Sequence, residues 1–94
     1  MEELEEIQRI IDDVNQRQIK NYHRMKIEEI SNELREAMKF EQEAFNKIDK
    51  LEKEGINPEL IKYAKMICRN TIEREISEIQ EVYLVKIDKE YLNN

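Results

Sequence analysis

One histidine and one cysteine are the residues of this chain best suited to nucleophilic, proton-transfer or metal chemistry. The positions one helical turn from His23 hold two isoleucines and two lysines, so no second metal ligand or proton carrier accompanies it on its helix. Cys68 falls on an apolar stripe between Ala64 and Ile72, far in sequence from the histidine, as a small core residue does. The sequence therefore predicts no catalytic residue, no metal site and no cofactor, and we expect a protein that is not an enzyme.

Six cations in two segments without acidic residues are the candidate docking residues for an acidic partner or an anionic small molecule. They are Arg17, Lys20, Arg24, Lys62, Lys65 and Arg69. Each group of three repeats one helical spacing, i, i+3 and i+7, which places its members on one face. In a helical hairpin the two groups are far apart, so we expect them to meet only across an oligomer interface.

Charge and composition limit the class of protein. The 94 residues carry a net charge of −6, which makes general nucleic-acid binding unfavourable, although contact through the basic segments stays an alternative. One glycine and one proline cannot supply the turns of a β-protein, and the apolar runs are too short to span a membrane. We predict a single all-α domain over residues 1–94, acidic and cytoplasmic, with no membrane segment.

The clearest local signals lie at residues 54–57. Gly55 suits the left-handed position after a helix, Asn57 is a good N-cap, and Pro58 fits the first turn of the next helix. Apolar residues then recur at helical spacing without interruption. The pattern predicts an antiparallel helical hairpin whose second arm is a helix over residues 58–92.

The first arm carries two apolar stripes that are out of phase. Leu4, Ile7, Ile11 and Val14 form one heptad stripe, and a second, coiled-coil-like stripe begins at Ile27. Either one helix runs over residues 2–53 with a kink or coiled-coil discontinuity near residues 15–21, or a short helix over residues 2–15 ends there and folds back, giving three helices. The absence of Gly and Pro between the stripes favours the continuous helix.

A continuous first arm is longer than its partner and overhangs the hairpin. Its overhang would leave Leu4, Ile7, Ile11 and Val14 in water, although each such side chain contributes about 1.5–3 kcal/mol when buried. We therefore predict that these four residues bind another polypeptide. A homodimer of two hairpins, forming a four-helix bundle, is the simplest solution.

The opening segment from Leu4 to Val14 resembles the first helix of the all-helical chorismate mutases, dimers with a very long first helix. The resemblance implies a helical dimer that binds an anionic small molecule. It does not extend to the family's motifs, because Gln8 stands where that family has an arginine. The segment at residues 39–43 also lacks its Asp-x-x-Arg-Glu motif, and Ser77 and Gln80 are one residue too close for its Ser-x-x-x-Gln motif.

The function expected from these observations is a non-enzymatic protein–protein interaction or assembly module. It would be an adaptor, a small subunit of a larger complex or a helical chaperone that acts through apolar helix faces. A helical dimer that binds an anionic small molecule and an accessory subunit that contacts nucleic acid are the alternatives.

Overall fold

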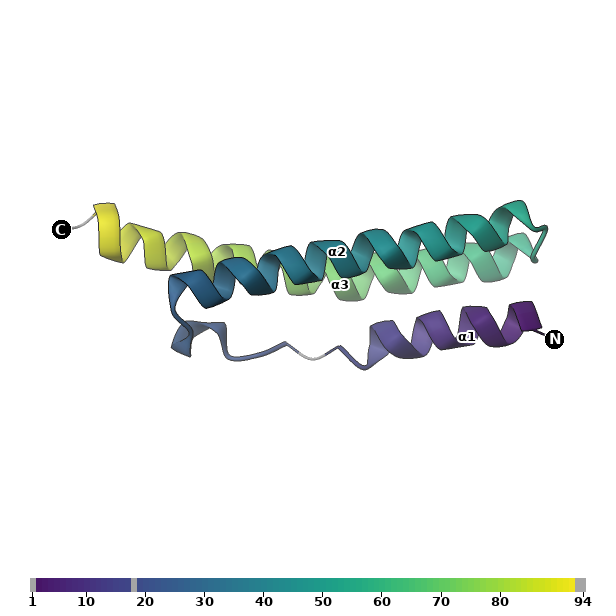
Figure 1. Cartoon of the computed structure of the whole chain (residues 1–94), viewed down its shortest axis with the longest axis horizontal. Coiled ribbons are helices and arrows are strands. Elements are labelled where there is room, and N and C mark those ends of the chain that lie inside the picture. The colour runs from purple at the N-terminus through teal and green to yellow at the C-terminus, as the bar shows by residue number, and fades with distance from the viewer. Residues whose placement is uncertain (1, 18, 93–94) are drawn as a thin grey trace.

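The protein is an all-α chain, as the sequence predicts. The computed structural model describes residues 2–17 and 19–92, with side chains for residues 4–17 and 19–90. Its elements, in chain order, are α1 (Glu2–Asn15), the 3-10 turn η1 (Tyr22–Arg24), α2 (Ile27–Lys53), α3 (Pro58–Ile87) and the π-helical turn η2 (Asp88–Leu92). Helices α2 and α3 lie antiparallel, and α1 lies along them near their connecting turn (Figure 1). The predicted hairpin is confirmed.

The turn between α2 and α3 is formed by a glycine in the left-handed conformation and by hydrogen bonds between near neighbours in the sequence. Gly55 has a φ of 88°, in the left-handed region that glycine adopts without strain. The Ile56 N–H donates to the Leu51 carbonyl at 3.4 Å, which closes the end of α2. The Asn57 side chain accepts a hydrogen bond from the Glu59 N–H at 2.9 Å, which caps α3.

The continuous first helix is wrong, and the alternative with a break is the one observed. Helix α1 ends at Asn15, and an irregular connection followed by η1 leads to α2 at Ile27. A straight helix would point its two apolar stripes in different directions and leave one in water. The chain reverses its direction at η1, before α2 begins (Figure 1). This reversal lets both stripes pack on the hairpin, which outweighs helical continuity. The very long first helix that the chorismate mutase resemblance implies is therefore not present.

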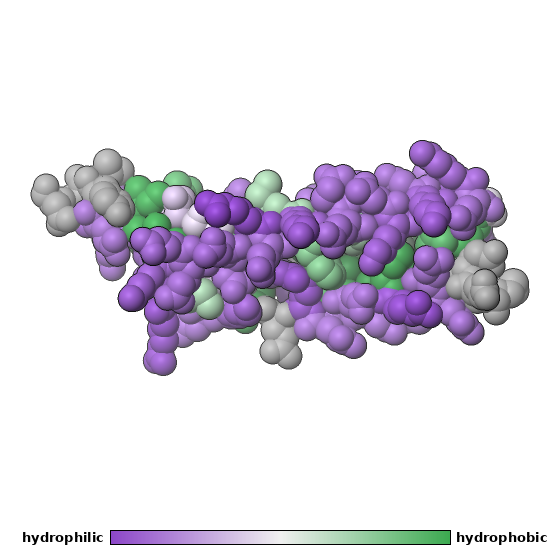
Figure 2. All heavy atoms as spheres, in the orientation of Figure 1, coloured by the Kyte–Doolittle hydropathy of each residue, from purple (hydrophilic) through white to green (hydrophobic). Residues whose placement is uncertain are grey.

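The core has two parts along the hairpin. The part near the turn lies under α1, and its buried residues are Ile7, Ile10, Ile11, Val14, Ala44, Ile48, Leu51, Ile61, Ala64, Cys68 and Ile72. The other part lies under η1 and consists of Tyr22, Ile30, Ala37, Ile79 and Val82. The surface is largely hydrophilic, and hydrophobic side chains are visible between α1 and the hairpin (Figure 2).

The molecule is a rod of 57 × 19 × 17 Å. Within its described residues, no helix combines the length and apolar character needed to pass through a lipid bilayer.

Candidate protein-interaction surface

The apolar stripe of α1 is covered within its own chain. Ile7, Ile11 and Val14 are 2%, 6% and 0% exposed, whereas Leu4 is 42% exposed. The premise that another polypeptide must bury this stripe is therefore wrong. The physical reason is the reversal of the chain at η1, which brings α1 onto the groove of α2 and α3. Of the four predicted partner-binding residues, Leu4 alone stays open to solvent.

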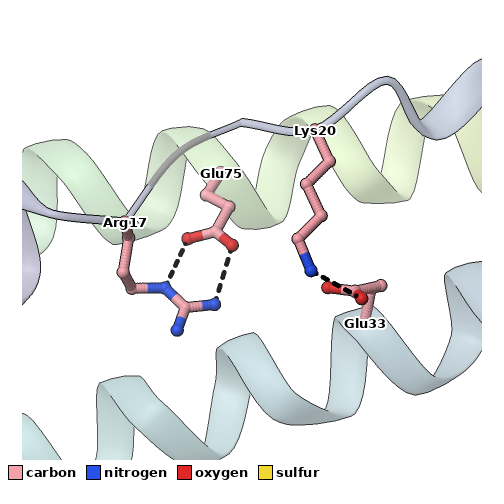
Figure 3. Close-up of polar contacts among 4 residues, drawn as sticks. All are labelled: Arg17, Lys20, Glu33 and Glu75. Carbon is pink, nitrogen blue, oxygen red and sulfur yellow. Dashed lines mark hydrogen bonds and ion pairs between the residues drawn. The ribbon is translucent and has the colours of Figure 1, made fainter.

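Two of the predicted docking cations hold the connection between α1 and η1 to the hairpin (Figure 3). Arg17 donates from Nε and Nη2 to the two carboxylate oxygens of Glu75 on α3, both at 2.8 Å. Lys20 pairs with Glu33 on α2 at 2.9 Å. Both cations are thus engaged by carboxylates of their own chain.

Glu75 needs this arginine because its side chain is only 5% exposed. The guanidinium also lies over the Phe40 ring, with Cζ 4.4 Å from the centroid. Hydrogen bonding to Glu75 raises the pKa of Arg17 above its ordinary value, against the lowering effect of burial. Glu75 is not among the functional residues predicted from the sequence, although its position on the apolar face between Ile72 and Ile79 indicates a buried charge.

An open pocket of about 390 Å³ beside Arg17 has a mixed lining that does not suit an anion. Its residues are Asp13, Gln16, Arg17, Lys20, Glu33, Glu36, Phe40 and Glu75. Carboxylates outnumber the two cations, and both cations are already paired. Across the part of the chain that the structure describes, no three histidine, cysteine, aspartate or glutamate side chains gather to hold a metal ion.

The second basic segment lies on α3, close to the hairpin turn. Lys65 contacts Asp49 at 3.5 Å and Glu52 at 3.4 Å across to α2, and Arg69 contacts Glu73 at 3.9 Å. A groove of about 470 Å³ runs among Lys62, Lys65 and Arg69. Arg24 lies exposed in η1, and neither it nor Lys62 forms an ion pair with any described residue. The structure does not bring the two basic segments together.

The hairpin has a second face, which we call the open face, on the side away from α1. On α2, Phe40 and Ala44 line a small cleft with Ile10 of α1, which identifies the covered side. At about 100° per residue, the open side of α2 lies about 100–180° around the helix from Phe40. Its residues are Ile27, Leu34, Met38, Glu41, Phe45, Asp49 and Glu52.

On α3, Glu75 marks the covered side, because it holds Arg17. The open side lies about 80–140° around the helix from it, and its residues are Lys62, Lys65, Arg69, Ile76, Tyr83 and Ile87. The contact of Lys65 with Asp49 and Glu52 spans this face. Together the two helices present cations and carboxylates near the turn and half-buried apolar side chains farther along.

The apolar part of the open face is incompletely covered. Met38 is 52% exposed, and Leu34, Phe45, Ile76 and Tyr83 are half-buried at the edge of the core. Leu84, at the margin of this face, is 65% exposed. Such a band of partly covered side chains is typical of a helix face that packs against another element.

Glu41 interrupts this apolar band. Its Oε2 is buried and has no hydrogen-bond partner among the described residues. Burial raises the pKa of the Glu41 carboxyl above its ordinary value, and repulsion from Glu73 raises it further. Burial also raises the pKa of the neighbouring Cys68 thiol, with a contribution from Glu41, which disfavours the reactive thiolate. Glu41 is thus a partly buried carboxylate without a hydrogen-bond donor for Oε2 in the described part of the chain.

Comparisons of the chain with protein-family models, with curated proteins and with solved structures found no match.

Proposed function

We propose that the protein is a non-enzymatic protein-interaction module that binds partner helices on its open face. The observation that carries the proposal is the buried, unpartnered Oε2 of Glu41 within an apolar band where Met38 is half exposed. The exposed apolar band is unfavourable in water and is buried when a helix covers the face. A hydrogen-bond donor on that helix would satisfy the Glu41 oxygen.

The interaction surface of this proposal differs from the one that the sequence indicated. Helix α1 already fills one groove of the hairpin, so its stripe stabilises the chain rather than a complex. The hairpin has two sides, and the open face is the side on which Met38 stays half exposed and the Glu41 Oε2 lacks a hydrogen-bond partner among the described residues. An adaptor or a small subunit of a complex uses such a surface.

Partner choice would come from charge, and affinity from apolar burial. Covering apolar area contributes about 25 cal/mol per Å². The cations on α3 and the carboxylates Asp49 and Glu52 on α2 flank the apolar band on its turn side. They would set the register of the bound helix and reject partners that place like charges there.

The two alternatives expected from the sequence have less support. Anion binding would use Arg17 and Lys20, whose charges are engaged by Glu75 and Glu33. Nucleic-acid binding would need a larger basic surface than the acid-flanked cations on α3 supply. The cytoplasm, where thiols stay reduced, is the compartment we propose, because the single cysteine forms no disulfide.

Site-specific photo-crosslinking in the source cell tests the proposal. A benzophenone side chain is placed at Met38 on the open face or, as control, at Tyr63, which is equally exposed but lies on another side of α3. We expect discrete crosslinked adducts from position 38 and none of comparable yield from position 63. Equal adducts from both positions, or none from either, would show that the open face is not a binding surface.

A further inference from the structure

We infer that the partner on the open face is a second copy of this chain, in a two-fold dimer whose axis runs parallel to the hairpin. This inference rests on the proposed function and names the occupant of the same surface. In the dimer, α2 of one protomer packs against α3 of its partner, and both turns lie at the same end.

The two helices present matching residues at each level of the open face. Near the turn, Lys65 of α3 lies level with Asp49 and Glu52 of α2, as their ion pairs show. In the middle, Glu41 lies 12 residues before the end of α2 at Lys53, and Arg69 lies 11 residues after the start of α3 at Pro58, so the two are about equally far from the turn. Farther along, Leu34 of α2 and Ile76 of α3 belong to the same half of the core.

Rotation about a two-fold axis parallel to the hairpin does not change how far each residue lies from the turn. It places each level of α2 against the same level of the partner's α3. Acidic residues of α2 then face lysines of α3, and apolar residues face apolar residues. The surface is therefore complementary to itself along its whole length, which an isologous interface requires.

The contact that distinguishes this arrangement is between Glu41 and Arg69 of the second copy. Among the described residues of one chain, Arg69 makes only a loose ion pair of 3.9 Å with Glu73, and both side chains are more than half exposed. Across the two-fold axis, Arg69 comes level with the buried Oε2 of Glu41, which has no donor of its own. A charge-assisted hydrogen bond there satisfies the carboxylate.

A dimer with its two-fold axis perpendicular to the hairpin lacks the contact between Glu41 and Arg69. An axis perpendicular to the hairpin places α2 on α2 and α3 on α3, with the turns at opposite ends. The cations near the turn then face the apolar half of the partner's α3, and Glu41 meets no cation of α3.

The first test measures mass by light scattering from micromolar to millimolar concentration. We expect a dimer for the wild type and for Tyr63→Glu, and a monomer for Met38→Glu at the same concentrations. Wild-type chains that stay monomeric throughout would overturn the inference. If Met38 nevertheless crosslinks to other proteins in cells, the proposed interaction function stands with a different partner, and if it crosslinks to nothing, both fail.

The second test reverses the charges of the predicted contact. Glu41→Lys and Arg69→Glu each create two like-charge contacts in a homodimer, so each variant alone should be monomeric where the wild type is dimeric. Mixed in equal amounts, they should form a heterodimer, because both contacts then pair opposite charges. A mixture that stays monomeric, with helical circular dichroism intact, would contradict the predicted pairing.

The third test decides the direction of the axis. A nitroxide spin label is attached at Lys53→Cys, beside the turn, in a Cys68→Ala background. Pulsed electron resonance should give an interprotomer distance well below the 57 Å length of the rod. A distance comparable to that length would indicate the perpendicular axis and overturn the parallel arrangement.

Discussion

Arg17 joins three segments of the chain. Its guanidinium contacts the Glu75 carboxylate through two hydrogen bonds and stacks on Phe40, while its backbone belongs to the connection after α1. A buried carboxylate without a partner is strongly unfavourable. The pairing of Glu75 with Arg17 therefore fixes the position of the connection on the hairpin. The residue suited by type to an external anion thus acts inside its own molecule.

Removing this arginine should therefore destabilise the fold. We expect Arg17→Ala to lower the free energy of unfolding by about 2–4 kcal/mol, because Glu75 stays buried without its cation. Lys20→Ala is the matched control, and the loss of its more exposed pair with Glu33 should lower it by about 0.2–1 kcal/mol. Urea unfolding measures both, and equal losses would contradict a special role for the pair with Glu75.

Glu41 should make the stability of the monomer depend on pH. Because its pKa is raised in the folded chain, the folded state binds the proton more tightly than the unfolded state. Ionised Glu41 therefore destabilises the fold above its folded pKa, and this penalty disappears as pH falls below the ordinary glutamate value.

We accordingly expect Glu41→Gln, at concentrations too low for dimers, to be more stable than the wild type at neutral pH. The difference should shrink toward zero as the pH of urea unfolding experiments is lowered from about 8 to about 4. A variant less stable than the wild type at neutral pH would mean that the carboxylate has a partner within the chain.

In the turn between α2 and α3, replacing Gly55 should change stability only through the backbone conformation. A Cβ atom built at Gly55 meets nothing within 4 Å, so only the positive φ opposes a larger residue. We expect Gly55→Val to lower the free energy of unfolding by about 1–2 kcal/mol. Gly55→Asn should lower it less, because asparagine adopts this conformation more readily. Equal losses would show that conformation is not the limiting factor.

Helix α1 depends on its packing. A 14-residue helix is only marginally stable alone, and its buried side chains hold it to the hairpin. We expect Val14→Asp to release α1, so that amide hydrogens of α1 exchange rapidly while α3 stays protected. Asn15→Asp, at an exposed neighbouring position, is the control. Uniform loss of protection in every helix would show that α1 is not a separate unit.

At the scale of the whole molecule, stability should depend on protein concentration. A dimer that buries the open face stabilises the folded state by mass action, whereas a monomer unfolds independently of concentration. We expect the thermal midpoint of the wild type to rise with concentration and that of Met38→Glu to stay constant. Parallel behaviour of the two proteins would contradict self-association through this face.

Local signals made the hairpin predictable. Gly55, Asn57 and Pro58 act on their immediate neighbours, and the periodicity of the flanking residues defines two helices. The stretch after Asn15 carries no Gly or Pro, so no local signal ends α1 there. Its end follows from contacts distant in sequence, such as that of Arg17 with Glu75, 58 residues away.

The sequence by itself determined that this protein is all-α, where its hairpin turns and which stripes of its helices are apolar, because these properties depend on neighbouring residues. Tertiary structure alone decided that α1 folds back to cover its own hairpin and that Glu41 is left on an uncovered face. Those outcomes depend on which apolar surfaces compete for the same groove, and that competition is resolved only when the whole chain packs.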